Sequence, residues 1–136
     1  MNIKFGKKDI IEMVEKYYKE ILDITGKVSI TCSKQLVGYG MGEHDDCVVT
    51  FKLKGQMSIL DKKRDIEIDV SEDEVMAAIT YYVEKEGYKY TGYRILRGMN
   101  PKVTGYLTNE RTVYTPYFNG IEVGVTNENF KKLINK

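Results

Sequence analysis

Strict alternation of apolar and polar residues in the first half of the sequence is the feature that most constrains the fold. Apolar residues occupy every second position from Val28 to Cys32, from Cys47 to Leu53 and from Ile66 to Val70. A period of two buries one face of a β-strand. The pattern predicts three strands, and their short connections favour antiparallel pairing.

Two other stretches of the sequence have a helical period. A first apolar series runs from Ile10 to Leu22, behind Asp9 as the expected N-cap and with Gly26 as the expected stop. Apolar residues at this spacing line one face of a helix. We therefore expect an amphipathic helix ahead of the first strand.

A second helix is predicted between the third strand and Gly87. Ser71 and Glu74 have the spacing of a capping box, and apolar residues follow from Val75 to Val83. A short third helix is expected near the C-terminus, where Thr126 or Asn127 would be the cap.

The second half contains aromatic and β-branched stretches that predict three more strands. They cover Tyr88–Leu96, Thr112–Phe118 and Ile121–Val125. The Asn119-Gly120 pair between the last two is typical of a two-residue hairpin, because both residues tolerate positive φ.

Together these elements predict an α+β fold in one domain, residues 1–136, with the order αβββαβββ(α). We expect a mostly antiparallel sheet with the two long helices on one face. The similar order in segments 7–60 and 71–125 has two explanations: an internal duplication, or the general likeness of amphipathic helices that end in glycine.

Length and charge limit the location and the partners. No apolar run is long enough for a membrane span, and the N-terminus lacks the pattern of a signal peptide. We expect a cytoplasmic protein without a membrane partner, whose two cysteines are reduced and serve as small core residues. A net charge of +1 means that any charged partner is recognised by a local patch.

A glycine-rich segment, "LVGYGMGEHDDCVV", contains the only histidine of the chain. Its acids and His44 are metal-ligand types, but consecutive residues do not converge on one ion, and a strand rather than a helix follows the glycines. We therefore expect no catalytic site, metal or cofactor, and interpret the segment as a solvated contact loop. The candidate contact residues of this loop are Tyr39, Glu43, His44, Asp45 and Asp46.

Tyrosines and basic residues alternate along the segment from residue 87 to 118. Aromatic rings next to cations suit single-stranded nucleic acid, and the same residue types are common at protein interfaces. Tyrosine also has a high strand propensity, so some of these rings are expected to be half-buried strand residues. The candidate binding residues are Tyr88, Tyr90, Tyr93, Arg94, Arg97, Lys102, Arg111 and Tyr114.

The sequence therefore predicts a small non-enzymatic binding module that uses a Tyr/Arg-rich strand face. A protein partner is favoured because the net charge is low, and self-association is one form that such a contact could take. The first alternative is a single-stranded nucleic-acid-binding protein that uses the same face. The second is a metal- or His-dependent enzyme built on residues 43–47.

Overall fold

The computed structural model contains two helices and six strands. It describes the backbone of residues 1–37, 44–105 and 111–127 and, within these, the side chains of all residues except 34–37, 44–47, 102, 104, 111, 113, 114 and 127. The elements are, in chain order, β1 (Asn2–Phe5), α1 (Lys7–Leu22), β2 (Thr25–Val37), β3 (His44–Ile59), β4 (Lys62–Val70), α2 (Glu72–Lys85), β5 (Tyr88–Thr104) and β6 (Arg111–Asn127).

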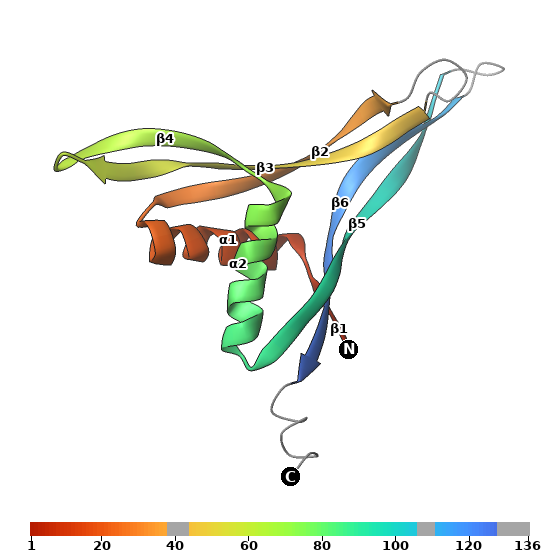
Figure 1. Cartoon of the computed structure of the whole chain (residues 1–136). Helices are drawn as coiled ribbons and strands as arrows, with labels where there is room; N and C mark the ends of the chain where they lie inside the picture. Colours follow the sequence, from red (N-terminus) through yellow and green to blue (C-terminus); the bar gives the residue numbers. More distant parts are fainter. Residues whose placement is uncertain (38–43, 106–110, 128–136) are drawn as a thin grey trace, which may run out of the picture.

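The strands form two three-stranded antiparallel sheets, ordered β2-β3-β4 and β1-β6-β5. Both helices lie in the angle between the sheets (Figure 1). The predicted α+β class is confirmed, as are the first three predicted strands, which lie inside β2, β3 and β4.

The helix ends agree with the sequence in one case and differ in the other. Ser71 caps α2 by accepting a hydrogen bond from the Glu74 N–H at 3.2 Å, and Gly87 follows the helix with φ of 91°, as predicted. In α1 the N-cap is Gly6, so the prediction of Asp9 was wrong. Asp9 lies three residues inside and accepts a hydrogen bond from the Gly6 N–H at 3.4 Å.

Helix α1 also ends earlier than predicted. Asp23, with φ of 54°, provides the left-handed turn after Leu22, and Gly26 lies within β2. Asp tolerates this conformation better than most residues, so no glycine is needed there.

The last two predicted strands are one continuous strand, β6, so the predicted hairpin at Asn119-Gly120 was wrong. The pair lies instead at an irregularity in the β5–β6 register, between the pairs Ile95/Ile121 and Arg97/Phe118. Gly120 has φ of 99°, as a bulge allows. A Cβ there would lie 2.4 Å from the carbonyl oxygen of Phe5 in β1. The sequence correctly indicated positive φ at Gly120, but this residue lies in a bulge beside β1 and not in a hairpin turn.

Strand β1 was missed, and the predicted third helix was placed mainly on residues that the structure does not describe. β1 has four residues, and Ile3 and Phe5 alternate with polar neighbours over too short a stretch to be distinguished from a loop. Its strand conformation depends on pairing with β6, from Asn2 opposite Gly124 to Phe5 opposite Ile121.

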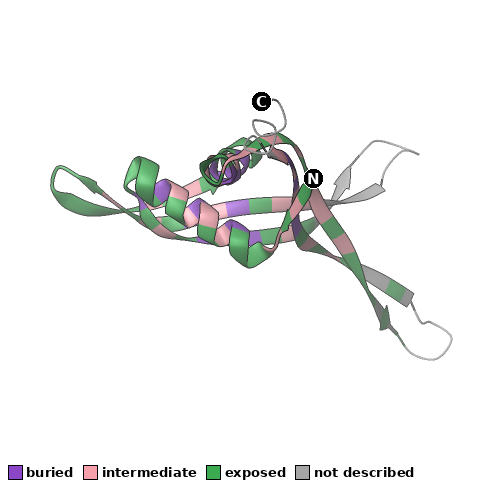
Figure 2. Ribbon diagram, turned by 90° about the horizontal axis from the view of Figure 1, so that it is seen from below, coloured by how far each residue is buried: buried purple, intermediate pink, exposed green. Residues whose placement is uncertain are grey.

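One hydrophobic core joins both sheets and both helices. Helix α1 contributes three buried residues one turn apart, Ile10, Val14 and Tyr18. Helix α2 contributes five, of which Val75, Ile79 and Val83 have the same spacing. Figure 2 shows the buried positions along the helix faces that meet the sheets.

The topology is symmetric under exchange of two βαββ units. β1 precedes α1, β2 and β3, and β4 precedes α2, β5 and β6. The first strand of each unit pairs with the last strand of the other, β1 with β6 and β4 with β3. Equivalent helix positions, such as Val14 and Ile79, differ by 65 in residue number. Duplication of segments 7–60 and 71–125 stays a prediction.

The expectation of reduced core cysteines was wrong for Cys32, which is half-buried and disulfide-bonded. The sequence holds one other cysteine, Cys47, and its backbone pairs with that of Lys34, two residues from Cys32. The alternation of apolar and polar residues predicted that each cysteine lies on a strand. It did not predict the register between the two strands, which decides how close the cysteines are. Because disulfides are typical of oxidising compartments, the cysteines no longer support the expected cytoplasmic location.

Candidate binding surfaces

The tyrosines predicted as a binding face lie mostly on the core side of β5. Tyr88 and Tyr90 are half-buried against the hydrophobic core. Tyr93 is on the same side, and its hydroxyl donates a hydrogen bond to Glu72 Oε2 at 2.8 Å. That hydrogen bond, followed by burial, raises the pKa of Tyr93, and burial alone raises the pKa of Tyr90. These rings stabilise the packing between β5 and α2.

Arg94 points to the opposite side of the same strand. Its guanidinium lies 3.4 Å from Glu122 Oε1, and the Arg94 side chain is 71% exposed. Asn2 in β1 donates a hydrogen bond to the same oxygen at 3.4 Å. The structure therefore separates Arg94 from Tyr88, Tyr90 and Tyr93.

Arg97 lies beyond the second irregularity of β5, opposite Phe118. The Phe118 ring makes an edge contact with the core residue Phe51, with ring centroids 5.9 Å apart, which identifies the core-facing side of this part of the ribbon. Met99 and Val103 lie two and six residues after Arg97, so they share its side of β5. They are 41% and 64% exposed. We call Arg97, Met99 and Val103 the ribbon patch.

The other predicted residues of this region have described backbones only. Lys102 pairs with Val113, Pro101 with Tyr114, and Thr104 with Arg111. Their predicted role as contact residues stays a prediction.

The predicted contact loop lies largely outside the described residues. This applies to Tyr39 and Glu43, whereas His44, Asp45 and Asp46 begin β3 and pair with residues 37, 36 and 35 of β2. Among the side chains that the structure describes, no group of three His, Cys, Asp or Glu residues could hold a metal ion. The described helices include none that is long and apolar enough to cross a membrane.

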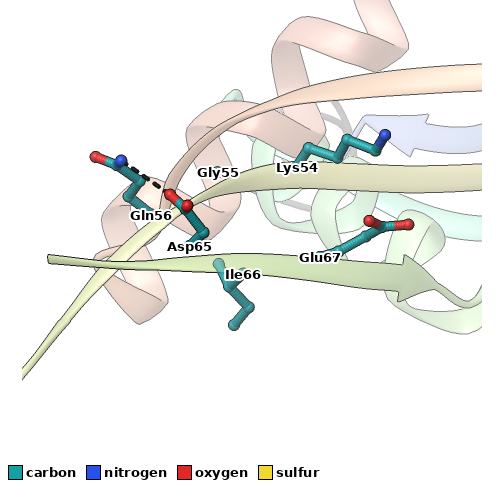
Figure 3. A pocket seen from close by; sticks show the side chains of 6 residues that line it. All are labelled: Lys54, Gly55, Gln56, Asp65, Ile66 and Glu67. Atoms are coloured by element: carbon teal, nitrogen blue, oxygen red, sulfur yellow. Dashed lines mark hydrogen bonds between the residues drawn. The ribbon is translucent and has the colours of Figure 1, made fainter.

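A hollow lies over Gly55, where β3 passes very close to β2 (Figure 3). A Cβ on Gly55 would lie 2.1 Å from the Thr25 carbonyl oxygen. At its rim Gln56 donates a hydrogen bond to Asp65 Oδ1 at 3.0 Å, and Ile66 points to the other face of β4. Gln56 and Asp65 are thus paired with each other and Glu67 is paired with Lys52, and the hollow lies where Gly55 has no side chain.

An aromatic cluster that was not predicted from the sequence lies between the helices. The rings of Tyr17 and Tyr81 meet edge to face with centroids 5.7 Å apart, and Lys85 Nζ lies 5.1 Å from the Tyr81 centroid. Lys85 also lies 3.8 Å from Glu20 Oε2. Burial and the Glu20 carboxylate raise the pKa of Tyr82. The Tyr-Tyr doublets in both helices were the available signal, and the cluster joins α1 to α2.

Comparison with known proteins adds no further guide to function: no family model, curated protein or solved structure matches the chain.

Proposed function

We propose that the protein is a non-enzymatic binding module that contacts a partner protein through the ribbon patch. The observation that carries this proposal is the exposure of Met99 and Val103. Both lie on the side of β5 that faces the core in the part of the strand closer to the helices. An apolar strip that continues from a core into solvent is typical of an interaction surface. Arg97 borders the strip, and Arg and Met are both enriched at protein interfaces.

A protein partner fits this surface better than single-stranded nucleic acid. Stacking of bases requires exposed aromatic platforms. Tyr88 and Tyr90 pack against the core, and the Tyr93 hydroxyl is bonded to Glu72. Tyr117 is 37% exposed, but it lies opposite Gly98, on the other side of the ribbon from Arg97. The described part of the segment therefore offers an apolar strip with one cation, which suits partial burial against another protein.

The test is site-specific photo-crosslinking from position 99 in an extract of the source organism. We expect a captured protein whose yield falls at least fivefold in Val103→Asp and in Arg97→Ala. Arg94→Ala is the matched control, because it removes the same charge from the opposite side of β5. Equal capture by all of these variants, with unchanged melting temperatures, would reject the ribbon patch.

A titration of labelled single-stranded DNA, single-stranded RNA and duplex DNA completes the test. We expect no salt-sensitive binding that depends on Arg97. Binding that falls steeply with salt and is lost in Arg97→Ala would instead favour a nucleic-acid-binding protein.

A further inference from the structure

The hairpin formed by β3 and β4 extends well beyond the helices, at the end of the molecule opposite the tip of the β5–β6 ribbon (Figure 1). Figure 2 shows the outer part of this hairpin as exposed. Its turn consists of Leu60 and Asp61, between Ile59 and Lys62, the last paired residues. We call residues 59–64 the hairpin tip.

Leu60 occupies a position that is unfavourable for leucine in two ways. Its φ is 54° and that of Asp61 is 60°, as in the two-residue turns that strongly prefer Asn-Gly. A left-handed conformation is a steric outlier for a bulky residue. Leu60 is also 86% exposed, so burial does not offset the strain. Neighbouring Ile59 is 47% exposed, which makes the turn an apolar point.

Along β4, the basic residues lie next to the turn and the acidic residues lie farther from it. Lys62, Lys63 and Arg64 are exposed and, in the described part of the chain, form no ion pair. Apart from Asp61 in the turn, acids begin at Asp65. Two of them are held by β3: Asp65 by Gln56 at 3.0 Å (Figure 3) and Glu67 by Lys52 at 2.8 Å. The Lys52 ammonium lowers the pKa of Glu67, so this carboxylate is charged.

We propose that the hairpin tip is a contact site for an anionic lipid bilayer, with Leu60 and Ile59 entering the interface and the three cations at the headgroups. A convex apolar point next to three cations, Lys62, Lys63 and Arg64, and one acid, Asp61, has a net positive charge and matches a soft, anionic surface. Asp65 lies about 13 Å along the strand from Asp61, at roughly 3.3 Å per residue. An interfacial element enters the bilayer by about 5–10 Å, so Asp65, Glu67 and Asp69 remain outside. Asp61 lies in the turn itself, at the level of the headgroups with the three cations.

The same division of charge disfavours duplex DNA. A two-stranded ribbon in a groove has phosphates along its length, and Asp65, Glu67 and Asp69 would lie beside them. The inference is independent of the ribbon patch. It departs from the expectation of no membrane partner, which rested on the missing apolar span and the low net charge, because a local tip needs neither.

The test is cosedimentation of the full chain with vesicles of phosphatidylcholine alone and of phosphatidylcholine mixed with phosphatidylglycerol, at low and physiological salt. We expect binding to the mixed vesicles only, weakened by salt. Lys62→Glu/Lys63→Glu should reduce it roughly 25-fold or more, at about fivefold per charge near the surface. Lys7→Glu/Lys8→Glu, the same charge change at the start of α1, is the matched control and should retain substantially more binding.

Leu60→Asn gives a second, independent readout. We expect roughly tenfold weaker vesicle binding, because an apolar side chain is lost. We also expect a melting temperature about 2–5 °C higher, because Asn accepts positive φ. Weaker vesicle binding together with a higher melting temperature would assign Leu60 a contact role, because the loss of a structural residue would lower the melting temperature.

Three results would overturn the inference. They are no binding to the mixed vesicles at low salt, equal loss in the two charge-reversal variants, and vesicle binding by Leu60→Asn at the wild-type level. Tip-dependent binding of duplex DNA without vesicle binding would also overturn it and assign the tip to nucleic acid. None of these results bears on capture through Arg97 and Val103, so the two proposals fail separately.

Discussion

Gly92 and Gly120 lie at the two irregularities of the β5–β6 pairing but differ in what surrounds them. A Cβ on Gly120 would lie 2.4 Å from the Phe5 carbonyl oxygen, and its φ is 99°. A Cβ on Gly92 would meet nothing within 4 Å. Only Gly120 is therefore required to be glycine by both its conformation and its surroundings.

We predict that Gly120→Ala lowers the free energy of unfolding by about 2–4 kcal/mol, because strain and the clash with β1 add. The measurement is urea unfolding followed by circular dichroism. Gly92→Ala is the control and should change stability by less than about 1 kcal/mol. Similar losses in the two variants would contradict the bulge geometry at Gly120.

Tyr18 is 3% exposed, and its hydroxyl donates a hydrogen bond to the Glu74 carboxylate on the other helix. Burial, then this hydrogen bond and the negative charge of Glu74, raises the pKa of Tyr18 well above its ordinary value. The folded state therefore favours the protonated phenol. The contact joins α1 to the first turn of α2.

We predict that Tyr18→Phe lowers stability at neutral pH by about 1–2 kcal/mol, because the hydrogen bond to Glu74 is lost. The loss is no larger because Glu74 is exposed and regains water. Above pH of about 10 the unfolded chain releases the Tyr18 proton while the folded chain retains it, so stability falls as pH rises. The variant should lose less stability in this range, as measured by urea unfolding from pH 8 to 11. Parallel pH curves would contradict the role of Tyr18. Tyr82, Tyr90 and Tyr93, whose pKa values are also raised, leave a residual slope in both proteins.

At the scale of elements, β2 and β3 form a long ribbon whose outer part extends beyond the helices (Figure 1). Cys32 lies in the middle of β2 and is disulfide-bonded. A crosslink within such a ribbon restricts the unfolded chain more than the folded one.

We predict that reduction lowers the free energy of unfolding by about 2–4 kcal/mol. The measurement is urea unfolding with and without a phosphine reductant, with intact mass to confirm the gain of two hydrogens. Cys32→Ser should unfold at the lower denaturant concentration under both conditions. A wild-type mass that already corresponds to two free thiols would contradict the disulfide.

At the scale of the whole molecule, neither βαββ unit forms a sheet of its own. Each first strand completes the sheet of the other unit, and the helices share one core with both sheets. The two halves therefore stabilise each other, and separate unfolding would break both sheets.

We predict one cooperative transition. Val14→Ala and Ile79→Ala, at equivalent and fully buried positions, should each lower stability by about 2–4 kcal/mol. Each should shift the far-UV and near-UV circular dichroism curves by the same amount. Lys16→Ala, on the exposed side of α1, is a control for helix substitution and should change stability by less than about 1 kcal/mol. Two separated transitions in either core variant would contradict a shared core.

The sequence by itself determined the local elements of this protein: the strand at Val28, the helix capped by Ser71, and the need for positive φ at Gly120. These depend on side-chain period, capping and turn chemistry, which act between residues a few positions apart. Tertiary structure decided that β1 is a strand, that Gly120 lies in a bulge, and that Tyr88 and Arg94 lie on opposite sides of β5. It also exposed Leu60 at the end of a projecting hairpin. Register and bulges are set by contacts between distant segments, and a one-residue shift moves a side chain to the other face of a sheet.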